Sequence, residues 1–125
     1  MSRKRILVVD DMAIYRDPVS IALEGAGYKA FRASDGPEAL HLIQTQVQPF
    51  SLLIVDYSMP QMNGLEFVEA ARNLKSVEIP VIMLTDMADK AVIIKAAQMG
   101  VKDYVLKSSF SLRELLAKVA THVPL

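Results

Sequence analysis

The stretch RILVVDDM, residues 5–12, joins a run of four apolar residues to two adjacent carboxylates, Asp10 and Asp11. A short apolar run bounded by polar residues is typical of a strand that is buried on both faces of a sheet. Adjacent residues of an extended strand point to opposite faces, so both carboxylates can serve one site only where the strand has ended and the backbone turns. The stretch therefore predicts a buried strand that ends at Asp10.

Comparable apolar runs recur along the chain and alternate with segments of helical period. The runs lie at residues 30–33, 52–55, 81–84 and 104–106, and apolar residues at helical spacing occur within 19–26, 39–47, 65–71, 92–99 and 112–123. Five strands that alternate with five helices through short connections predict a parallel sheet with helices on both faces. We expect a three-layer α/β fold, formed by one domain over residues 1–125.

Residues at the expected helix ends support this pattern. SDGP at residues 34–37 offers a capping residue followed by a proline at a first helical position, and Ser111 with Glu114 forms an S-x-x-E capping box. Pro18 fits less well, because it lies about a turn into the first helix and lacks a backbone donor. We expect a kink or a late start of the helix there.

The composition limits the function classes. The 125 residues carry 14 basic and 14 acidic side chains, which argues against direct contact with nucleic acid. Cysteine is absent, so neither a disulfide framework nor a thiolate metal site can form. The apolar runs are too short to span a bilayer, and the N-terminus has no signal-peptide pattern. We expect a soluble, cytoplasmic protein that does not associate with a membrane.

Polar residues follow four of the expected strands. They are Asp10 and Asp11 after the first strand, Asp56 after the third, Thr85 after the fourth and Lys107 after the fifth. Taken singly, each has an ordinary explanation as a turn former, a capping hydroxyl or a surface lysine. Parallel strands bring their carboxyl ends to one edge of the sheet, which is where such folds bind ligands. The joint placement therefore favours a functional site.

Three carboxylates close together repel one another unless a cation neutralises them or they share protons. Magnesium prefers oxygen ligands and usually takes only one or two carboxylates, which leaves another free to react. Asp56 is the better candidate for the nucleophile, because it follows the LLIV strand at residues 52–55, which we expect to be central. A carboxylate that attacks phosphorus forms an aspartyl phosphate, and Lys107 and Thr85 would supply an ammonium and a hydroxyl to the phosphoryl oxygens.

Four motifs carry a resemblance to a known family. They are VVDD at residues 8–11, VDYSMPQMNG at 55–64, MLTD at 83–86 and AAQMGVKDYVLK at 96–107. With them the chain resembles the receiver domains of two-component response regulators, close to the chemotaxis-type proteins, over essentially its whole length. The resemblance implies a flavodoxin-like fold with the strand order 2-1-3-4-5.

The resemblance also implies roles for individual residues. Asp56 would accept a phosphoryl group from the phosphohistidine of a histidine kinase. Magnesium would be bound by Asp11, Asp56 and the backbone carbonyl of Ser58, and by Asp10 directly or through water. The phosphoryl oxygens would be held by Thr85 and Lys107.

The resemblance further implies how the signal leaves the site. Thr85 would shift toward the phosphoryl group and Tyr104 would turn inward. The surface that changes would consist of the fourth helix, the fifth strand and the fifth helix, expected around residues 92–99, 104–106 and 112–123. A downstream protein or an attached output domain would recognise this surface, because the phosphoryl contacts bias a pre-existing equilibrium.

Three positions depart from the family pattern. Ser108 follows Lys107 where the family usually has a proline in a cis peptide bond, and a cis bond before serine would cost about 3 to 4 kcal/mol. A trans bond would put the reach of Lys107 in doubt. Asp86 and Met87 follow Thr85 where small residues are usual, so repulsion and crowding are expected to slow phosphorylation and to prolong the phosphorylated state.

Two function classes stay open. The first is a phosphorylation-operated switch that catalyses only its own phosphorylation and dephosphorylation and is otherwise not an enzyme. The second is a degenerate receiver that works as a constitutive interaction module. A phosphatase with an aspartate nucleophile would need an acid at residue 58, which is Ser58. A flavin site would need a phosphate-binding loop after the first strand, where DDMAIYR at residues 10–16 would repel phosphate.

Overall fold

The computed structural model describes residues 3–75 and 78–125, which form alternating strands and helices. The elements are β1 Arg5–Val9, α1 Ala13–Gly25, β2 Lys29–Ala33, α2 Gly36–Thr45, β3 Leu52–Val55, α3 Gly64–Lys75, β4 Val81–Thr85, α4 Lys90–Gln98, β5 Asp103–Leu106 and α5 Leu112–His122. All strand pairs are parallel, and the strand order is β2-β1-β3-β4-β5. The predicted α/β fold class and strand order are confirmed.

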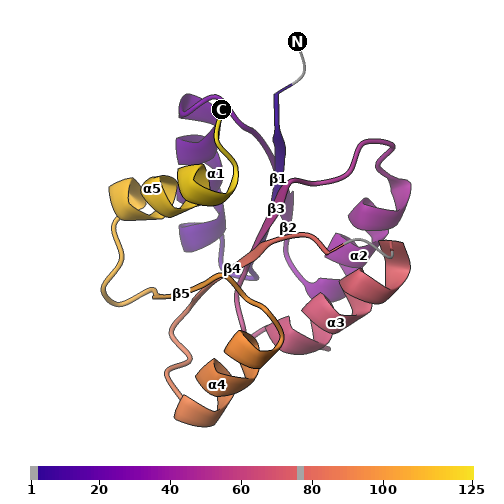
Figure 1. Cartoon of the computed structure of the whole chain (residues 1–125), viewed down its shortest axis with the longest axis vertical. Coiled ribbons are helices and arrows are strands. Elements are labelled where there is room, and N and C mark those ends of the chain that lie inside the picture. The colour runs from indigo at the N-terminus through magenta and orange to yellow at the C-terminus, as the bar shows by residue number, and fades with distance from the viewer. Residues whose placement is uncertain (1–2, 76–77) are drawn as a thin grey trace.

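Helices cover both faces of the sheet. Figure 1 shows α1 and α5 on one side and α2, α3 and α4 on the other. Alternate residues of β1 serve the two sides, since Ile6 and Val8 pack with residues of α1 and α5, whereas Leu7 and Val9 pack with residues of α2, α3 and α4. The two hydrophobic cores therefore share the strands of one sheet.

The middle strands carry almost no polar side chains because neither face reaches water. Every residue of β3, LLIV, and of β4, VIMLT, is buried. β3 pairs with β1 on one side and β4 on the other, which places Asp56, the next residue after β3, at the centre of the carboxyl edge of the sheet. No helix in the described part of the chain is long and apolar enough to cross a membrane.

Of the two expectations for Pro18, the late start of the first helix is wrong, whereas the kink stays a prediction. α1 begins at Ala13 and runs through Pro18, although proline cannot donate the helical hydrogen bond. The helix buries Val19 and Leu23 against the sheet, and this packing outweighs the local preference of proline. Both predicted capping residues are confirmed: Asp35 of SDGP accepts a hydrogen bond from the Glu38 N–H at 2.8 Å, and Ser111 accepts one from the Glu114 N–H at 3.1 Å, which is one half of the predicted capping box.

Gly64 allows the loop after β3 to pass close to the backbone of Asp56 and Tyr57. Its N–H donates to the Tyr57 carbonyl at 2.8 Å, and a Cβ at this position would press on the Asp56 carbonyl and lie 3.0 Å from the Tyr57 Cα. Both neighbours are backbone atoms, which cannot rotate away. The close approach therefore requires glycine at the start of α3.

We predict that Gly64→Ala lowers the free energy of unfolding by about 1 to 3 kcal/mol, because the added methyl group forces the backbone at Asp56 and Tyr57 to move. Gly25→Ala is the matched control, since its Cβ would meet no atom within 4 Å. This change should raise the free energy of unfolding by roughly 0.5 to 1 kcal/mol, through helix propensity. Urea denaturation followed by circular dichroism measures both values, and equal effects of the two substitutions would contradict the prediction.

Candidate functional site

The structure brings the predicted polar residues together at the carboxyl edge of the sheet. Asp10, Asp56, Thr85 and Lys107 follow or end neighbouring strands, and all four side chains are buried. The Asp56 N–H continues the sheet by donating to the Val9 carbonyl at 3.0 Å, which sets the ends of β1 and β3 side by side. The structure thus places these four side chains at one edge of the sheet, whereas their chemical roles stay predictions.

Three carboxylates form a cluster. Oxygen atoms of Asp10, Asp11 and Asp56 lie within 4.8 Å of one another, with Asp11 exposed and the other two buried. Asp10 is further held by the Met12 N–H, which donates to its Oδ1 at 2.9 Å. Carboxylate oxygens at such separations are the ligands that a hard divalent cation prefers. The donor set therefore fits magnesium.

Lys107 reaches the cluster although the peptide bond that follows it is trans. Its Nζ lies 2.9 Å from Asp10 Oδ2 and 3.1 Å from Asp56 Oδ2, and its side chain is only 2% exposed. The described residues contain no cis peptide bond, so the bond from Lys107 to Ser108 is trans. The Lys107 N–H donates to the Thr85 carbonyl at 2.9 Å and anchors the end of β5 on β4. A trans bond therefore does not prevent the lysine from reaching the site.

Burial and nearby charges shift the pKa values of Asp10 and Lys107. Burial raises the pKa of Asp10, and the nearby charge of Asp56 adds to this effect, while hydrogen bonds from Lys107 and the Met12 N–H oppose it. Burial lowers the pKa of Lys107, but its hydrogen bonds to Asp10 and Asp56 outweigh that effect and the pKa is raised. Lys107 is therefore a permanent cation of the site at neutral pH.

The two predicted switch residues are joined through the backbone of Met87. The Met87 N–H donates to Thr85 Oγ1 at 3.2 Å, and the Tyr104 hydroxyl donates to the Met87 carbonyl. Burial raises the pKa of the Tyr104 hydroxyl, so it stays protonated and remains a donor. Sequence reasoning noted Met87 only for its bulk, because a backbone bridge leaves no trace in residue type.

A cavity of about 440 Å³ opens onto the site. Asp11, Asp56 and Lys107 contribute to its lining, and Asp86 and Met87 form part of its wall. Further lining residues include Ser58 and Thr85. Asp56 is therefore buried in the protein yet faces a space that a small phosphorylated molecule can enter.

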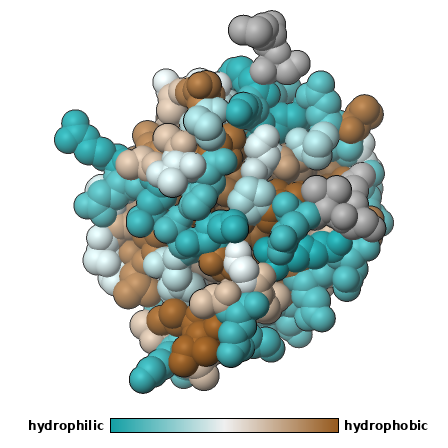
Figure 2. All heavy atoms as spheres, viewed as in Figure 1, coloured by the Kyte–Doolittle hydropathy of each residue, from teal (hydrophilic) through white to brown (hydrophobic). Residues whose placement is uncertain are grey.

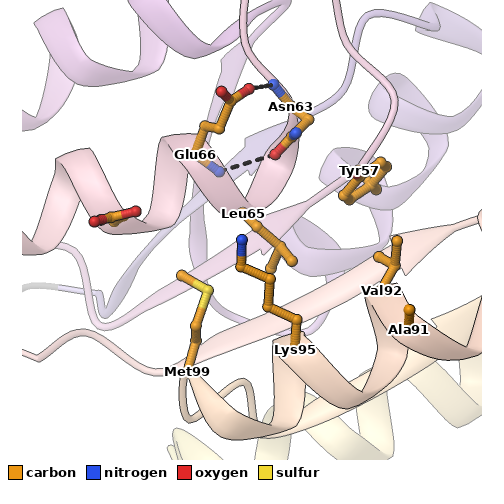
Figure 3. A pocket seen from close by; sticks show the side chains of 9 residues that line it. Tyr57, Asn63, Leu65, Glu66, Ala91, Val92, Lys95 and Met99 are labelled. Atoms are coloured by element: carbon orange, nitrogen blue, oxygen red, sulfur yellow. Dashed lines mark hydrogen bonds between the residues drawn. The ribbon is translucent and has the colours of Figure 1, made fainter.

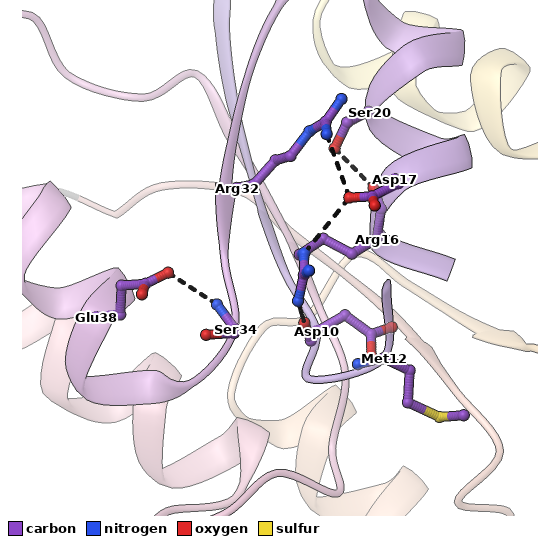
Figure 4. Close-up of polar contacts among 8 residues, drawn as sticks. All are labelled: Asp10, Met12, Arg16, Asp17, Ser20, Arg32, Ser34 and Glu38. Atoms are coloured by element: carbon purple, nitrogen blue, oxygen red, sulfur yellow. Dashed lines mark hydrogen bonds and ion pairs between the residues drawn. The ribbon is translucent and has the colours of Figure 1, made fainter. Parts of the chain in front are cut away.

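Arg16 supports the site from α1 and was missed by sequence reasoning. Figure 4 shows its guanidinium between the carbonyl of Asp10, 3.0 Å from Nη1, and the carboxylate of Asp17, 3.6 Å from Nε. Arg32 on β2 also pairs with Asp17 at 3.2 Å. These contacts tie the turn after β1 to α1 and β2, and nothing in the sequence spacing indicates them.

A second cavity, of about 270 Å³, lies between α3 and α4. Figure 3 shows Tyr57, Leu65 and Met99 among its lining side chains, with a reciprocal pair of hydrogen bonds between Asn63 and Glu66 that caps α3. The cavity reaches Tyr57, the neighbour of Asp56, but none of the predicted site residues lines it. The predicted chemistry therefore belongs to the cavity at the carboxyl edge.

Known proteins are similar to this chain in sequence. The chain is 37% identical over 123 residues to the phosphate regulon transcriptional regulatory protein PhoB of Pseudomonas aeruginosa, a match that covers 95% of this chain and 51% of PhoB. The chain spans about half the length of the curated relatives it matches. Those relatives therefore contain a further part that has no counterpart in the matched region.

Solved structures of other proteins superpose on this chain over almost its whole length. The receiver domain protein of Methanospirillum hungatei superposes with a TM-score of 0.87 at 32% identity and covers 96% of this chain and 93% of its own. The chemotaxis protein CheY4 of Vibrio cholerae gives 0.87 at 32% identity, over 97% of this chain and 99% of its own. The family described as "Response regulator receiver domain" matches residues 6–120. The chain thus belongs to the receiver domains of two-component response regulators.

Proposed function

We propose that the chain is a phosphorylation-operated switch in which Asp56 accepts the phosphoryl group of a phosphohistidine on a histidine kinase or phosphotransfer protein. The observation that carries the proposal is the ion pair between the buried Asp56 carboxylate and Lys107, 3.1 Å apart and facing the cavity at the carboxyl edge. A carboxylate of this kind is a nucleophile with a cation already beside it.

The transfer is a displacement at phosphorus. An Asp56 oxygen forms the new phosphorus–oxygen bond while the phosphorus–nitrogen bond of the donor breaks, and the imidazole leaves with its electron pair. Lys107 donates to a phosphoryl oxygen, and the Thr85 hydroxyl donates to another once the Met87 loop has adjusted. The reaction needs positioning and charge neutralisation more than further covalent chemistry. Catalysis is limited in this proposal to the chain's own phosphorylation and dephosphorylation.

Magnesium is the proposed cofactor. Three carboxylates face one ammonium, so the cluster keeps an excess of negative charge that a divalent cation would balance. Asp11, Asp56 and the backbone carbonyl of Ser58 would hold the ion, and Asp10 would hold it directly or through water, as the family resemblance implies. When bound, it would neutralise phosphoryl oxygens during the transfer.

The signal would leave through the Met87 loop. A Thr85 hydroxyl that turns to the phosphoryl group gives up its bond from the Met87 N–H, and the Met87 carbonyl also holds Tyr104. The loop leads directly into α4. Figure 2 shows hydrophobic surface over this helix, where Ile94 is 48% exposed. A partner or an output domain would dock on α4, β5 and α5 and respond to this change.

The relatives suggest the kind of output. PhoB is named a transcriptional regulatory protein, and this chain matches about half of it. An attached or separate effector would therefore carry the output. The expectation that this chain does not itself bind nucleic acid, which rests on its balanced charge, stays a prediction.

The first test is phosphorylation by a small donor. Incubation with acetyl phosphate and magnesium should add the mass of one phosphoryl group to the native protein, and peptide mass spectrometry should place it on Asp56. Asp56→Asn and addition of a chelator should abolish the adduct, whereas Asp103→Asn, a carboxylate outside the site, should not. The absence of an adduct and of any response to beryllofluoride would contradict the proposal and favour the degenerate receiver.

The second test is the stability of a Lys107→Met variant without metal. It should lose roughly 1 to 3 kcal/mol of unfolding free energy at neutral pH, because Asp10 and Asp56 lose the cation that offsets their repulsion. Lys118→Met removes a longer and more exposed ion pair with Asp103 and should cost about 0 to 1 kcal/mol. Chemical denaturation measures both, and equal losses would contradict the account.

The pH dependence of the Lys107→Met defect follows from Asp10. The raised pKa of Asp10 means that the folded protein binds the Asp10 proton more tightly than the unfolded chain does. This tighter binding stabilises the fold fully at pH values below 3.8, the ordinary pKa of the group, and the stabilisation is lost as the pH rises through the pKa of the folded state. Loss of Lys107 removes a hydrogen bond that lowers this pKa. The loss of unfolding free energy in Lys107→Met should therefore become smaller as the pH falls from neutral toward the pKa of Asp10. A loss that does not change with pH would show that the charge of Asp10 is not its cause.

The third test concerns the wall of the cavity. Asp86→Ala should speed phosphorylation by acetyl phosphate about two- to fivefold, because a carboxylate beside the entry repels anions. It should also shorten the life of the product, because the smaller side chain hinders the hydrolysing water less. Asp89→Asn is the control, since it removes a nearby charge but keeps an amide that can cap α4. Equal phosphorylation rates in the native protein and Asp86→Ala, measured by quenched time courses, would contradict the prediction.

A further inference from the structure

The aromatic ring of Tyr15 lies directly against the lysine of the site. Lys107 Nζ lies over this ring, 4.3 Å from its centroid, a distance at which an ammonium is attracted by the negative face of the π system. Because the Lys107 side chain is almost wholly buried, little water competes for this contact. Three groups thus surround the ammonium: the carboxylates of Asp10 and Asp56, and the Tyr15 ring.

The ring is held in place from two sides. The Tyr15 N–H donates to the Met12 carbonyl at 3.0 Å in the first turn of α1, and the ring contacts that of Phe110, with centroids 6.3 Å apart and an interplanar angle of 46°. Phe110 lies three residues after Lys107 and packs on the core beneath α1 and α5. The aromatic pair therefore links α1 to the loop that follows Lys107, where Ser108 supplies no proline constraint.

The carboxylate partners of Lys107 change during the proposed reaction, whereas the ring does not. Phosphorylation turns one Asp56 oxygen into the bridging oxygen of an acyl phosphate and moves negative charge to the phosphoryl group. Asp10 would also be engaged by the metal. The ring face attracts the ammonium equally before and after these changes, because it takes no part in them.

We propose that Tyr15 is a positioning residue for phosphoryl transfer, whose ring face keeps the Lys107 ammonium in the site while its carboxylate partners are exchanged. This inference rests on the proposed function of Asp56. Tyr15 acts through Lys107 and does not itself touch the phosphoryl group.

The competing explanation is that Tyr15 only fills space beside Phe110. The two explanations differ in one physical property: packing depends on the shape of the ring, whereas attraction of a cation depends on its electron density. A trifluorinated phenylalanine at position 15 nearly preserves the shape and removes most of the negative face. Comparison with Tyr15→Phe, which keeps both, therefore separates the explanations.

The experiment measures phosphorylation by acetyl phosphate in saturating magnesium for the native protein, Tyr15→Phe, the trifluorinated variant, Tyr15→Leu and Phe110→Leu. We expect Tyr15→Phe to stay within about twofold of the native maximal rate constant, and the trifluorinated and Leu variants to fall roughly three- to tenfold. The acetyl phosphate concentration at half-maximal rate should not change. Phe110→Leu should have the smaller effect, because it leaves the Tyr15 ring over the lysine.

A second readout needs neither metal nor phosphate. The ring current of Tyr15 should shift the ε-methylene proton resonances of Lys107 upfield in the metal-free native protein, and Tyr15→Leu should abolish this shift. A native chain that takes no phosphoryl group overturns the proposed function and this inference with it. If the native chain is phosphorylated, equal rates for Tyr15→Phe and the trifluorinated variant would overturn this inference alone. Unshifted Lys107 resonances would do the same.

Discussion

The attraction between the Lys107 ammonium and the buried carboxylates of Asp10 and Asp56 is the interaction on which the site depends. The parallel sheet creates the need for it, because the ends of β1 and β3 lie side by side and each is followed by an aspartate. The end of β5 supplies the cation. Three carboxylates against one ammonium still leave an excess of negative charge, and this excess makes the edge of the sheet receptive to a divalent cation.

The sheet and the convergence of its strand-end residues could be predicted because both follow from simple rules. Apolar runs and helical spacing determine the alternation of elements, and parallel strands must bring Asp10, Asp56 and Lys107 to one edge. Local rules failed where packing competed with them. Pro18 predicts a kink or a late helix start, yet α1 already starts at Ala13, because burial of Val19 and Leu23 stabilises the longer helix.

Other parts of the site could not be predicted because they depend on side-chain direction or on the backbone alone. Arg16 binds the Asp10 carbonyl from α1, and the Tyr15 ring meets Lys107 from the opposite end of the chain. Residue types at those positions fit an ordinary helix equally well. The Met87 backbone joins Thr85 to Tyr104 whatever side chain residue 87 carries. The sequence also could not predict that the bond after Lys107 is trans and that the lysine still reaches its partners, because this depends on the position of Nζ.

If a divalent cation balances the excess negative charge beside Asp56, magnesium stabilises the folded chain, and thermal unfolding measures this stabilisation. The melting temperatures of the native protein and of Asp11→Asn are compared in magnesium and in a chelator, at an ionic strength matched with sodium chloride. Magnesium should raise the melting temperature of the native protein and raise that of Asp11→Asn much less, because a cation that binds only the folded chain stabilises it. Equal melting temperatures of the native protein with and without magnesium would show that no such cation binds beside Asp56.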